Sequence, residues 1–271
     1  SLALALGAEW AARRKGGGVL AVVVDHQLQP GSDEVANQVH AQLSRHGVPA
    51  RTVRVTVESG QGGVEAAARD ARYAALEAFR RPVLLGHTLD DQAEQVFLGL
   101  IRGSGTRTVA GMPARRGPFL RPLLGVRRAT TVQACADWGV APWHDPMNDD
   151  SAFMRVRVRR ALAALEDSVG RDLAPNLART ARLARADADL LDSLLEGGTA
   201  PVALAVRDLV ELPDALRWRR IKQWLEAHDA EPGMQHVFAV DALVTAWRGQ
   251  GPIDVPGGKV LRSGGELRLL G

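Results

Sequence analysis

The chain has 271 residues, of which 46% are hydrophobic and 24% are charged. This balance excludes a mainly disordered or collagen-like protein, and the length allows one large domain or two modest ones. No apolar run approaches the roughly 20 residues that span a bilayer, so we expect no membrane partner and a cytoplasmic location. The formal charge of +3 does not establish a nucleic-acid partner, and the single cysteine, Cys135, excludes an internal disulfide or a cysteine-based cluster.

The first part of the chain alternates predicted helices with predicted strands. The expected helices cover residues 2–15, 34–45, 64–79 and 89–102, and the expected strands cover 20–24, 52–57 and 83–85. Ser32 or Asp33 would cap the second helix, and Gly47 would end it. Strands and helices that alternate in this way predict an α/β fold, a Rossmann-like doubly wound parallel sheet with helices on both faces.

Beyond Gly103 the predicted elements become mainly helical. Residues 103–122 are rich in Gly, Pro and Arg and read as a loop. The later expected helices cover residues 126–137, 153–165, 172–195, 213–228 and 235–247, with a strand at 202–206 and short β runs over 251–270. We therefore expect two domains, residues 1–165 with the parallel sheet and residues 166–271 with a helical linker and a smaller, mainly helical domain.

The segment that follows the third predicted strand carries an unusual group of polar residues. His87, Asp91 and Glu94 are spaced by four and three residues, so they share one face of the helix that begins there. The carboxyl ends of parallel strands are where ligands bind in open α/β sheets. Two carboxylates on one face suit a Mg²⁺ ion and an amine. Asp90 fits a helix cap as well as it fits a functional role.

Several motifs in this order and spacing resemble the tRNA(Ile)-lysidine synthetase family of PP-loop ATP pyrophosphatases. The motifs are VDH at 24–26, GVEAAARDARY at 63–73, GHTLDDQAE at 86–94, RGSG at 102–105, GMP at 111–113, LRPLL at 120–124, DPMN at 145–148 and FMRVRVR at 153–159. The resemblance covers about residues 1–165 and is much weaker beyond them. It implies that ATP adenylates the C2 carbonyl of the wobble cytidine in a CAU anticodon, after which the ε-amine of lysine displaces AMP.

The resemblance also implies which residues act. The expected ATP-binding residues are Ser1, Val24, Asp25, His26, Gly86, His87 and Asp91, and Asp91 would also hold Mg²⁺. Asp91, His87 and Arg69 would be catalytic, and Glu94 and Arg69 would bind lysine. Arg102, Arg155, Arg157 and Arg159 would contact tRNA or the triphosphate. The implied partners are ATP, Mg²⁺, free L-lysine and tRNA(Ile) with a CAU anticodon, and a homodimer is compatible with the family.

Simpler interpretations exist for the arginines. On residues 64–79, Arg69 and Arg72 could lie on a solvated helix face with Asp70, and only the family pattern favours a role for Arg69. The arginines of residues 155–160 could likewise form a solvated helix face. Only three of the 34 cations are lysines, a bias that a GC-rich genome explains, although clustered guanidinium groups also pair with phosphate.

The start of the chain departs from the family pattern. The family signature is a strand followed by Ser-Gly-Gly-x-Asp-Ser, and Ser1 resembles the last serine of that loop. We therefore expect the gene product to begin earlier, with residues 1–165 forming the ATP-binding catalytic domain and residues 166–271 forming the linker and the tRNA-binding domain.

Three other functions remain open at this point. A tRNA thiolase is disfavoured by the single cysteine, and amidating synthetases lack the paired motifs at 86–95 and 102–105. A non-catalytic tRNA-binding remnant is the alternative from a different class, and it predicts tRNA binding without dependence on ATP.

Overall fold

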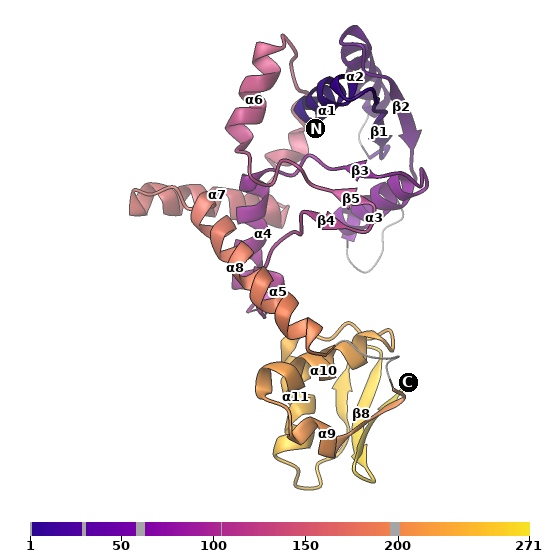
Figure 1. Ribbon diagram of the computed structural model, residues 1–271, viewed down its shortest axis with the longest axis vertical. Coiled ribbons are helices and arrows are strands. Elements are labelled where there is room, and N and C mark those ends of the chain that lie inside the picture. Colours follow the sequence, from indigo (N-terminus) through magenta and orange to yellow (C-terminus); the bar gives the residue numbers. More distant parts are fainter. Residues whose placement is uncertain (1, 29–30, 58–62, 104, 196–200) are drawn as a thin grey trace. The chain divides into compact units, whose positions relative to one another are not determined.

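The computed structural model describes residues 2–28, 31–57, 63–103, 105–195 and 201–271 (Figure 1). It divides into two compact units. Unit 1 comprises Ser1–Leu98 with Met112–Ala178, and unit 2 comprises Gly99–Gly111 with Arg179–Gly271. No helix within the described ranges is long and apolar enough to cross a membrane. The division of function between residues 1–165 and 166–271 stays a prediction.

Unit 1 contains the alternating elements that the hydrophobic pattern predicts. The elements that lie wholly or mainly in it are α1 (Leu2–Arg14), β1 (Ala21–Asp25), α2 (Ser32–Arg45), β2 (Ala50–Arg54), α3 (Gly63–Glu77), β3 (Val83–Leu84), α4 (Leu89–Ile101), β4 (Arg115–Arg116), β5 (Phe119–Leu120), α6 (Arg128–Asp137), the 3-10 turn η1 (Pro146–Asn148) and α7 (Met154–Val169).

The strands of unit 1 pair in parallel where the βα alternation requires it. β1 pairs with β2 from Ala21 opposite Ala50 to Asp25 opposite Arg54, and β3 pairs in parallel with β5. β4 adds to β5 in the antiparallel direction, so the described strands form one two-stranded sheet and one three-stranded sheet. Asp25, at the carboxyl end of β1, and the segment after β3 both lie at strand ends, where an α/β fold places its ligands.

Small apolar clusters hold unit 1 together. Leu6 of α1, Leu43 of α2 and Cys135 of α6 belong to one cluster, which the partly buried Val23 of β1 joins. Leu98, Val158 and Leu162 form a second cluster between α4 and α7. Cys135 is buried and forms no disulfide, so packing explains it.

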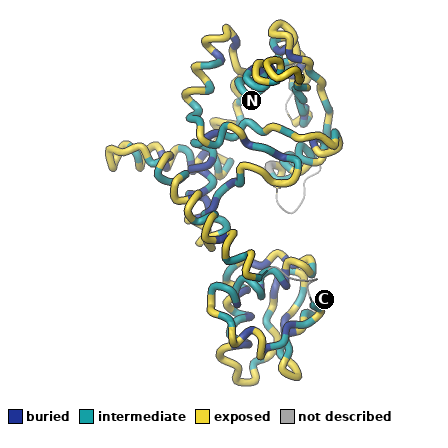
Figure 2. Tube along the Cα trace, viewed as in Figure 1, coloured by how far each residue is buried: buried dark blue, intermediate teal, exposed yellow. Residues whose placement is uncertain are grey.

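Unit 2 has a single, larger core. Its elements are α5 (Thr106–Val109), β6 (Ala203–Ala205), α9 (Val206–Val210), α10 (Asp214–Glu226), α11 (Met234–Thr245), β7 (Ile253–Val255), β8 (Gly258–Ser263), β9 (Glu266–Leu270) and most of α8 (Ala174–Ser193). The strands form an antiparallel sheet in the order β6-β9-β8-β7. Trp224 of α10, Val240 of α11 and Val260 of β8 are at most 1% exposed and lie in the same cluster, so the helices pack on the sheet (Figure 2).

Two local predictions are wrong. Gly31, with a φ of 80°, occupies the cap position of α2, so Ser32 and Asp33 lie inside the helix and make no cap. The segment 103–122 is not all loop, because it contains α5, β4 and β5. The described structure also has α9, a five-residue helix that the sequence did not predict. These elements have two to five residues, too few for a periodic pattern.

Candidate functional site

The turn from β3 into α4 places the central polar residues of unit 1. The backbone N–H and hydroxyl of Thr88 both donate to Oδ2 of Asp91 at 2.7 Å, and the N–H of Asp91 donates to Oγ1 of Thr88 at 3.4 Å. This reciprocal pair is a capping box, so Asp91 helps to start α4. Asp90 instead accepts a hydrogen bond from the N–H of Arg128 at 2.6 Å, at the first residue of α6.

Asp91 and Glu94 share one guanidinium group. Nη2 of Arg128 lies 2.8 Å from Oδ1 of Asp91 and 3.0 Å from Oε1 of Glu94. Nε of Arg159, on α7, lies 2.8 Å from the same oxygen of Glu94. The Glu94 side chain is 3% exposed, and its second oxygen, Oε2, is buried without a hydrogen-bond partner among the described residues. Two carboxylates and two guanidinium groups thus meet between three helices, with one acceptor left open.

Hydrogen bonding lowers the pKa of Asp91. Burial alone would raise the pKa of this carboxyl, but the two hydrogen bonds from Thr88 and the Arg128 guanidinium outweigh burial and hold the pKa below its ordinary value. For Arg128, burial works against the charged form, and the carboxylates of Asp91 and Glu94 more than offset it, so its pKa is raised. Both groups are therefore charged at neutral pH.

His87 lies among cations. Burial, together with Arg121, Arg72 and Arg155 and against the opposing effect of Asp91, lowers the pKa of His87 to about 4. The imidazole is therefore neutral at pH 7, and it can donate or accept a hydrogen bond but supplies no charge. Its Nδ1 is buried without a partner in the described part of the chain.

Two arginines of α3 lie beside the ring of Tyr73, in the same region as His87. The guanidinium carbon of Arg69 lies 5.2 Å from the centre of the Tyr73 ring, and that of Arg72 lies 5.8 Å from it. Nη2 of Arg121 donates to the Tyr73 hydroxyl at 3.4 Å. The Nε atoms of Arg72 and Arg121 are buried without a partner among the described residues, so the solvated interpretation of Arg72 is wrong. Guanidinium donors that are buried and unpaired suit an anionic ligand such as a phosphate.

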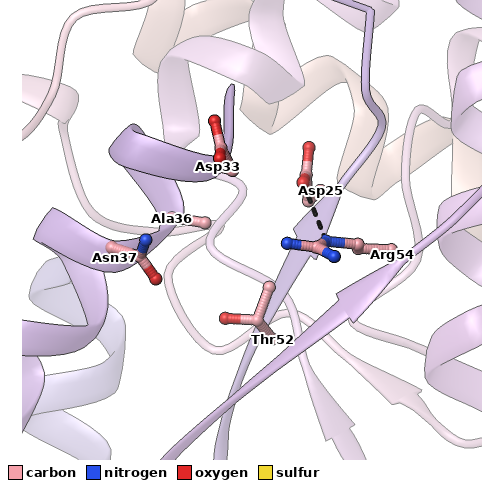
Figure 3. Close-up of a pocket in the computed structure, with 6 residues that line it drawn as sticks. All are labelled: Asp25, Asp33, Ala36, Asn37, Thr52 and Arg54. Atoms are coloured by element: carbon pink, nitrogen blue, oxygen red, sulfur yellow. Dashed lines mark ion pairs between the residues drawn. The ribbon is translucent and has the colours of Figure 1, made fainter. Parts of the chain in front are cut away.

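A polar cavity opens at the carboxyl ends of β1 and β2 (Figure 3). Its volume is about 380 Å³, and its walls are Asp25, Asp33, Ala36, Asn37, Thr52 and Arg54. The Asp25 carboxylate is 2% exposed, accepts a hydrogen bond from the N–H of Gln27 at 3.0 Å and faces Nε of Arg54 at 3.9 Å. His26 is close enough to both Asp25 and Arg72 for each to affect its pKa. Burial lowers the pKa of His26, Arg72 lowers it further, and the opposing effect of Asp25 is smaller. The cavity lies within the size range of small-molecule sites.

The arginines of α7 point in two directions. Arg155 and Arg159 are one turn apart and both reach α4, where Arg155 donates to Gln95 at 3.4 Å and Arg159 donates to Glu94. Arg157 instead donates to the carbonyl oxygens of Ser151 and Ala152 at 2.7 Å. Arg155 and Arg159 therefore share one face of α7, and Arg157 lies on another.

The described residues give poor support for a protein-held Mg²⁺ site. Both oxygens of Asp91 accept hydrogen bonds or ion pairs from Thr88 and Arg128. No group of three or more His, Cys, Asp or Glu side chains with metal-binding geometry occurs within the described ranges. The donor set of the described residues does not fit the ion.

Comparisons with known proteins give the family. The PP-loop domain model matches residues 1–166, and the TilS substrate binding domain model matches residues 204–268. The tRNA(Ile)-lysidine synthase of Nocardia farcinica is 52% identical over 88% of this chain and 77% of its own length. That of Leifsonia xyli subsp. xyli is 48% identical over 98% of this chain and 85% of its own length. This chain belongs to the tRNA(Ile)-lysidine synthase family.

Family membership confirms the predicted fold class and the predicted enzyme class, an ATP-dependent ligase. A solved structure with the same fold is the U34-tRNA thiolase NcsA from Methanococcus maripaludis with its [4Fe-4S] cluster. It has a TM-score of 0.54 and 13% identity over 68% of this chain and 70% of that one. At this identity the likeness concerns the fold alone.

The structure gathers most of the predicted lysidine synthase residues in unit 1. Arg69, His87, Asp91, Glu94, Arg155 and Arg159 are joined by the contacts above, and Val24, Asp25 and His26 lie at the end of β1. Gly86 lies between β3 and His87. Arg102 is exposed in unit 2, and Ser1 lies outside the described residues. The functional roles of all these residues stay predictions.

Sequence reasoning missed Arg128 and gave too little weight to Arg72 and Arg121. Arg128 is 37 residues beyond Asp91, in a segment without any motif that marks it. The LRPLL motif contains Arg121, but its 5% exposure follows only from the fold. Spacing along one helix can predict neighbours on that helix, whereas contacts between α4 and α6 require the tertiary structure.

Proposed function

We propose that this chain catalyses the ATP-dependent joining of lysine to the wobble cytidine of tRNA(Ile) with a CAU anticodon. Its membership of the lysidine synthase family and its substrate-binding domain support a tRNA(Ile) substrate, wobble modification and the use of ATP. In the proposed reaction, the C2 oxygen of cytidine attacks the α-phosphorus of ATP and pyrophosphate leaves. The lysine ε-amine then attacks C2, the C2–O bond breaks, AMP leaves and the amine loses its protons.

One observation carries the proposal for unit 1. Charged groups of opposite sign lie side by side after β3, with carboxylates on α4 and unpaired guanidinium nitrogens on and beside α3. Phosphates need cationic donors, while an amine needs a carboxylate. A site for a triphosphate next to a site for an amine is what the joining of these two substrates requires.

We assign the roles from this chemistry. Arg69, Arg72, Arg121 and Arg155 would bind the phosphates, and neutral His87 would donate a hydrogen bond to them. Oε2 of Glu94 would accept a hydrogen bond from the lysine amine, because it is the open acceptor of the pair. The cavity beside Asp25 would accept the nucleoside part of ATP, since carboxylates and amides suit ribose hydroxyls and a base edge. Arg102, Arg157 and Arg159 remain our candidates for tRNA contacts. A homodimer and a requirement for Mg²⁺ also remain expectations from the family resemblance, although the described carboxylates do not form a site for the ion by themselves.

The test is incorporation of radiolabelled lysine into transcribed tRNA(Ile) with a CAU anticodon, with and without ATP. We expect lysine, AMP and pyrophosphate in equal amounts, and no incorporation into the same tRNA with a UAU anticodon. Binding of the CAU tRNA without any ATP-dependent incorporation would contradict the proposal and favour the non-catalytic alternative. Assays without Mg²⁺ would test the expected requirement for the ion. Sedimentation, which gives the mass of the enzyme in solution, would test the expected homodimer.

A further inference from the structure

Arg128 occupies a place that no motif in the sequence marks. It is the first residue of α6, and a single nitrogen of its guanidinium touches both Asp91 and Glu94. Its backbone is fixed as well, because its N–H donates to Asp90 at 2.6 Å. Backbone and side chain therefore both bind the first two turns of α4.

The geometry leaves a specific acceptor free. Oε1 of Glu94 receives Nη2 of Arg128 at 3.0 Å and Nε of Arg159 at 2.8 Å, so two charged donors fix that oxygen. Oε2 has no hydrogen-bond partner among the described residues and is buried. A buried carboxylate oxygen without a partner is costly, and a substrate donor would remove that cost.

The negative charges of the two carboxylates explain why guanidinium groups lie beside them. Asp91 and Glu94 lie three residues apart on one helical face, so their carboxylates repel one another. A shared cation offsets this repulsion, and its loss would leave a buried carboxylate without its partner. Without Arg128, Arg159 alone would hold Oε1 of Glu94, so the direction of Oε2 would be less well fixed.

We propose that Arg128 is a positioning residue, which holds Asp91 and Glu94 at a fixed separation and aims Oε2 of Glu94 at the lysine amine. This inference rests on the proposed function. It predicts that Arg128 affects the binding of lysine through Glu94. The effect of replacing Arg128 should therefore disappear when Glu94 is already neutral.

The experiment is a double-mutant cycle of Arg128→Gln and Glu94→Gln, with the KM for lysine as its readout. We expect each single substitution to raise this KM at least about tenfold, as removal of one partner from a buried charge pair does in binding. The double variant should resemble Glu94→Gln alone, because the two groups act as one unit. Arg128→Lys should recover part of the loss, since it keeps the charge.

Arg127→Gln is the matched control. Arg127 is the neighbouring arginine and pairs with Asp90 and Asp172, but no described contact joins it to Asp91 or Glu94. We expect its lysine KM to change less than about twofold. Independent, multiplying effects of Arg128→Gln and Glu94→Gln would overturn the inference, as would an Arg128→Lys variant that is folded and no better than Arg128→Gln. Absence of lysine incorporation by the unmodified enzyme would instead reject the proposed function itself.

Discussion

Unit 1 and unit 2 both bury charged side chains, but they treat them differently. Arg217 of unit 2 is 7% exposed and donates to Asp241 and Asp214 at 2.6 Å and to the carbonyl oxygen of Leu212 at 2.8 Å. Glu94 of unit 1 has paired neighbours at one oxygen and none at the other. The pairing of Arg217 is complete within the fold, whereas the open oxygen of Glu94 requires a partner from outside the described residues, such as a ligand or a water molecule.

The apolar cores differ in the same sense. Unit 2 packs its helices and its sheet around one continuous cluster that includes Ile221, Leu243 and Leu267, each fully buried. Unit 1 relies on smaller clusters at its helices and leaves its strand ends polar. Among the described residues, Trp218 Nε1 is the buried side-chain atom of unit 2 that lacks a partner, against five in unit 1. This difference supports our proposal that the chemistry takes place in unit 1.

The largest expected effect is on catalysis in unit 1. Asp91→Asn keeps the shape and an acceptor for Thr88 but removes the charge that Arg128 pairs with. We expect adenylation to fall about 1,000-fold, which corresponds to about 4 kcal/mol. Exchange of labelled pyrophosphate into ATP in the presence of the CAU tRNA measures it. Asp167→Asn, which changes an exposed carboxylate of α7 away from the site, serves as a control for the loss of a helical carboxylate, and near-normal exchange by Asp91→Asn would reject the site assignment.

The next effect is on stability in unit 2. Arg217→Ala would leave Asp241, whose side chain is 13% exposed, without its main partner. We expect the free energy of unfolding to fall by about 3 kcal/mol, as measured by denaturant titration. Arg268→Ala, which breaks an exposed pair with Glu266, should change it by less than about 0.5 kcal/mol. Equal effects of the two substitutions would show that pairing of Arg217 does not stabilise the unit.

A smaller effect concerns the pH dependence of stability. Because the pKa of His87 falls from 6.5 in its ordinary state to about 4 in the folded chain, the unfolded chain binds a proton more readily. Stability from this group is therefore complete above pH 6.5 and decreases as the pH falls toward 4. Between pH 7 and pH 5, the free energy of unfolding of His87→Gln should fall by about 2 kcal/mol less than that of the unmodified protein. Identical pH dependence of the two unfolding curves would contradict the lowered pKa.

The smallest expected effect concerns tRNA. Arg102 is exposed in unit 2, and as a phosphate contact it would add a salt-dependent term to binding. Arg102→Ala should weaken tRNA binding about threefold and reduce the slope of log K against log salt by about 1, while Arg102→Lys should keep both. An unchanged slope in filter binding at several salt concentrations would remove Arg102 from the interface.

Local sequence patterns predicted the long elements well. The valines of β1, the alanine-rich α3 and the amphipathic α7 appear within a few residues of their expected ends, since hydrophobic periodicity is strong over that length. β4 and β5 have two residues each and exist because they pair with β3 and with each other, so a local pattern cannot predict them.

Spacing alone predicted the candidate site only along one helix, and the family resemblance added residues from other elements such as Asp25 and Arg69. The spacing of His87, Asp91 and Glu94 placed them on a common face, and the structure brings Arg128 and Arg159 to that face from two other helices. The spacing also could not tell that Asp91 caps α4 while Asp90 binds the start of α6, because that depends on how α6 approaches. Partners from distant segments come from the fold and not from periodicity.

The central claim is that the open oxygen of Glu94 receives the lysine amine. Steady-state incorporation of labelled lysine by Glu94→Gln, with lysine and ATP varied in turn, tests it most directly. We predict a lysine KM at least about tenfold higher than that of the unmodified enzyme and an ATP KM within about twofold of it. Equal increases in both constants would contradict the claim and make Glu94 a structural link between α4, α6 and α7.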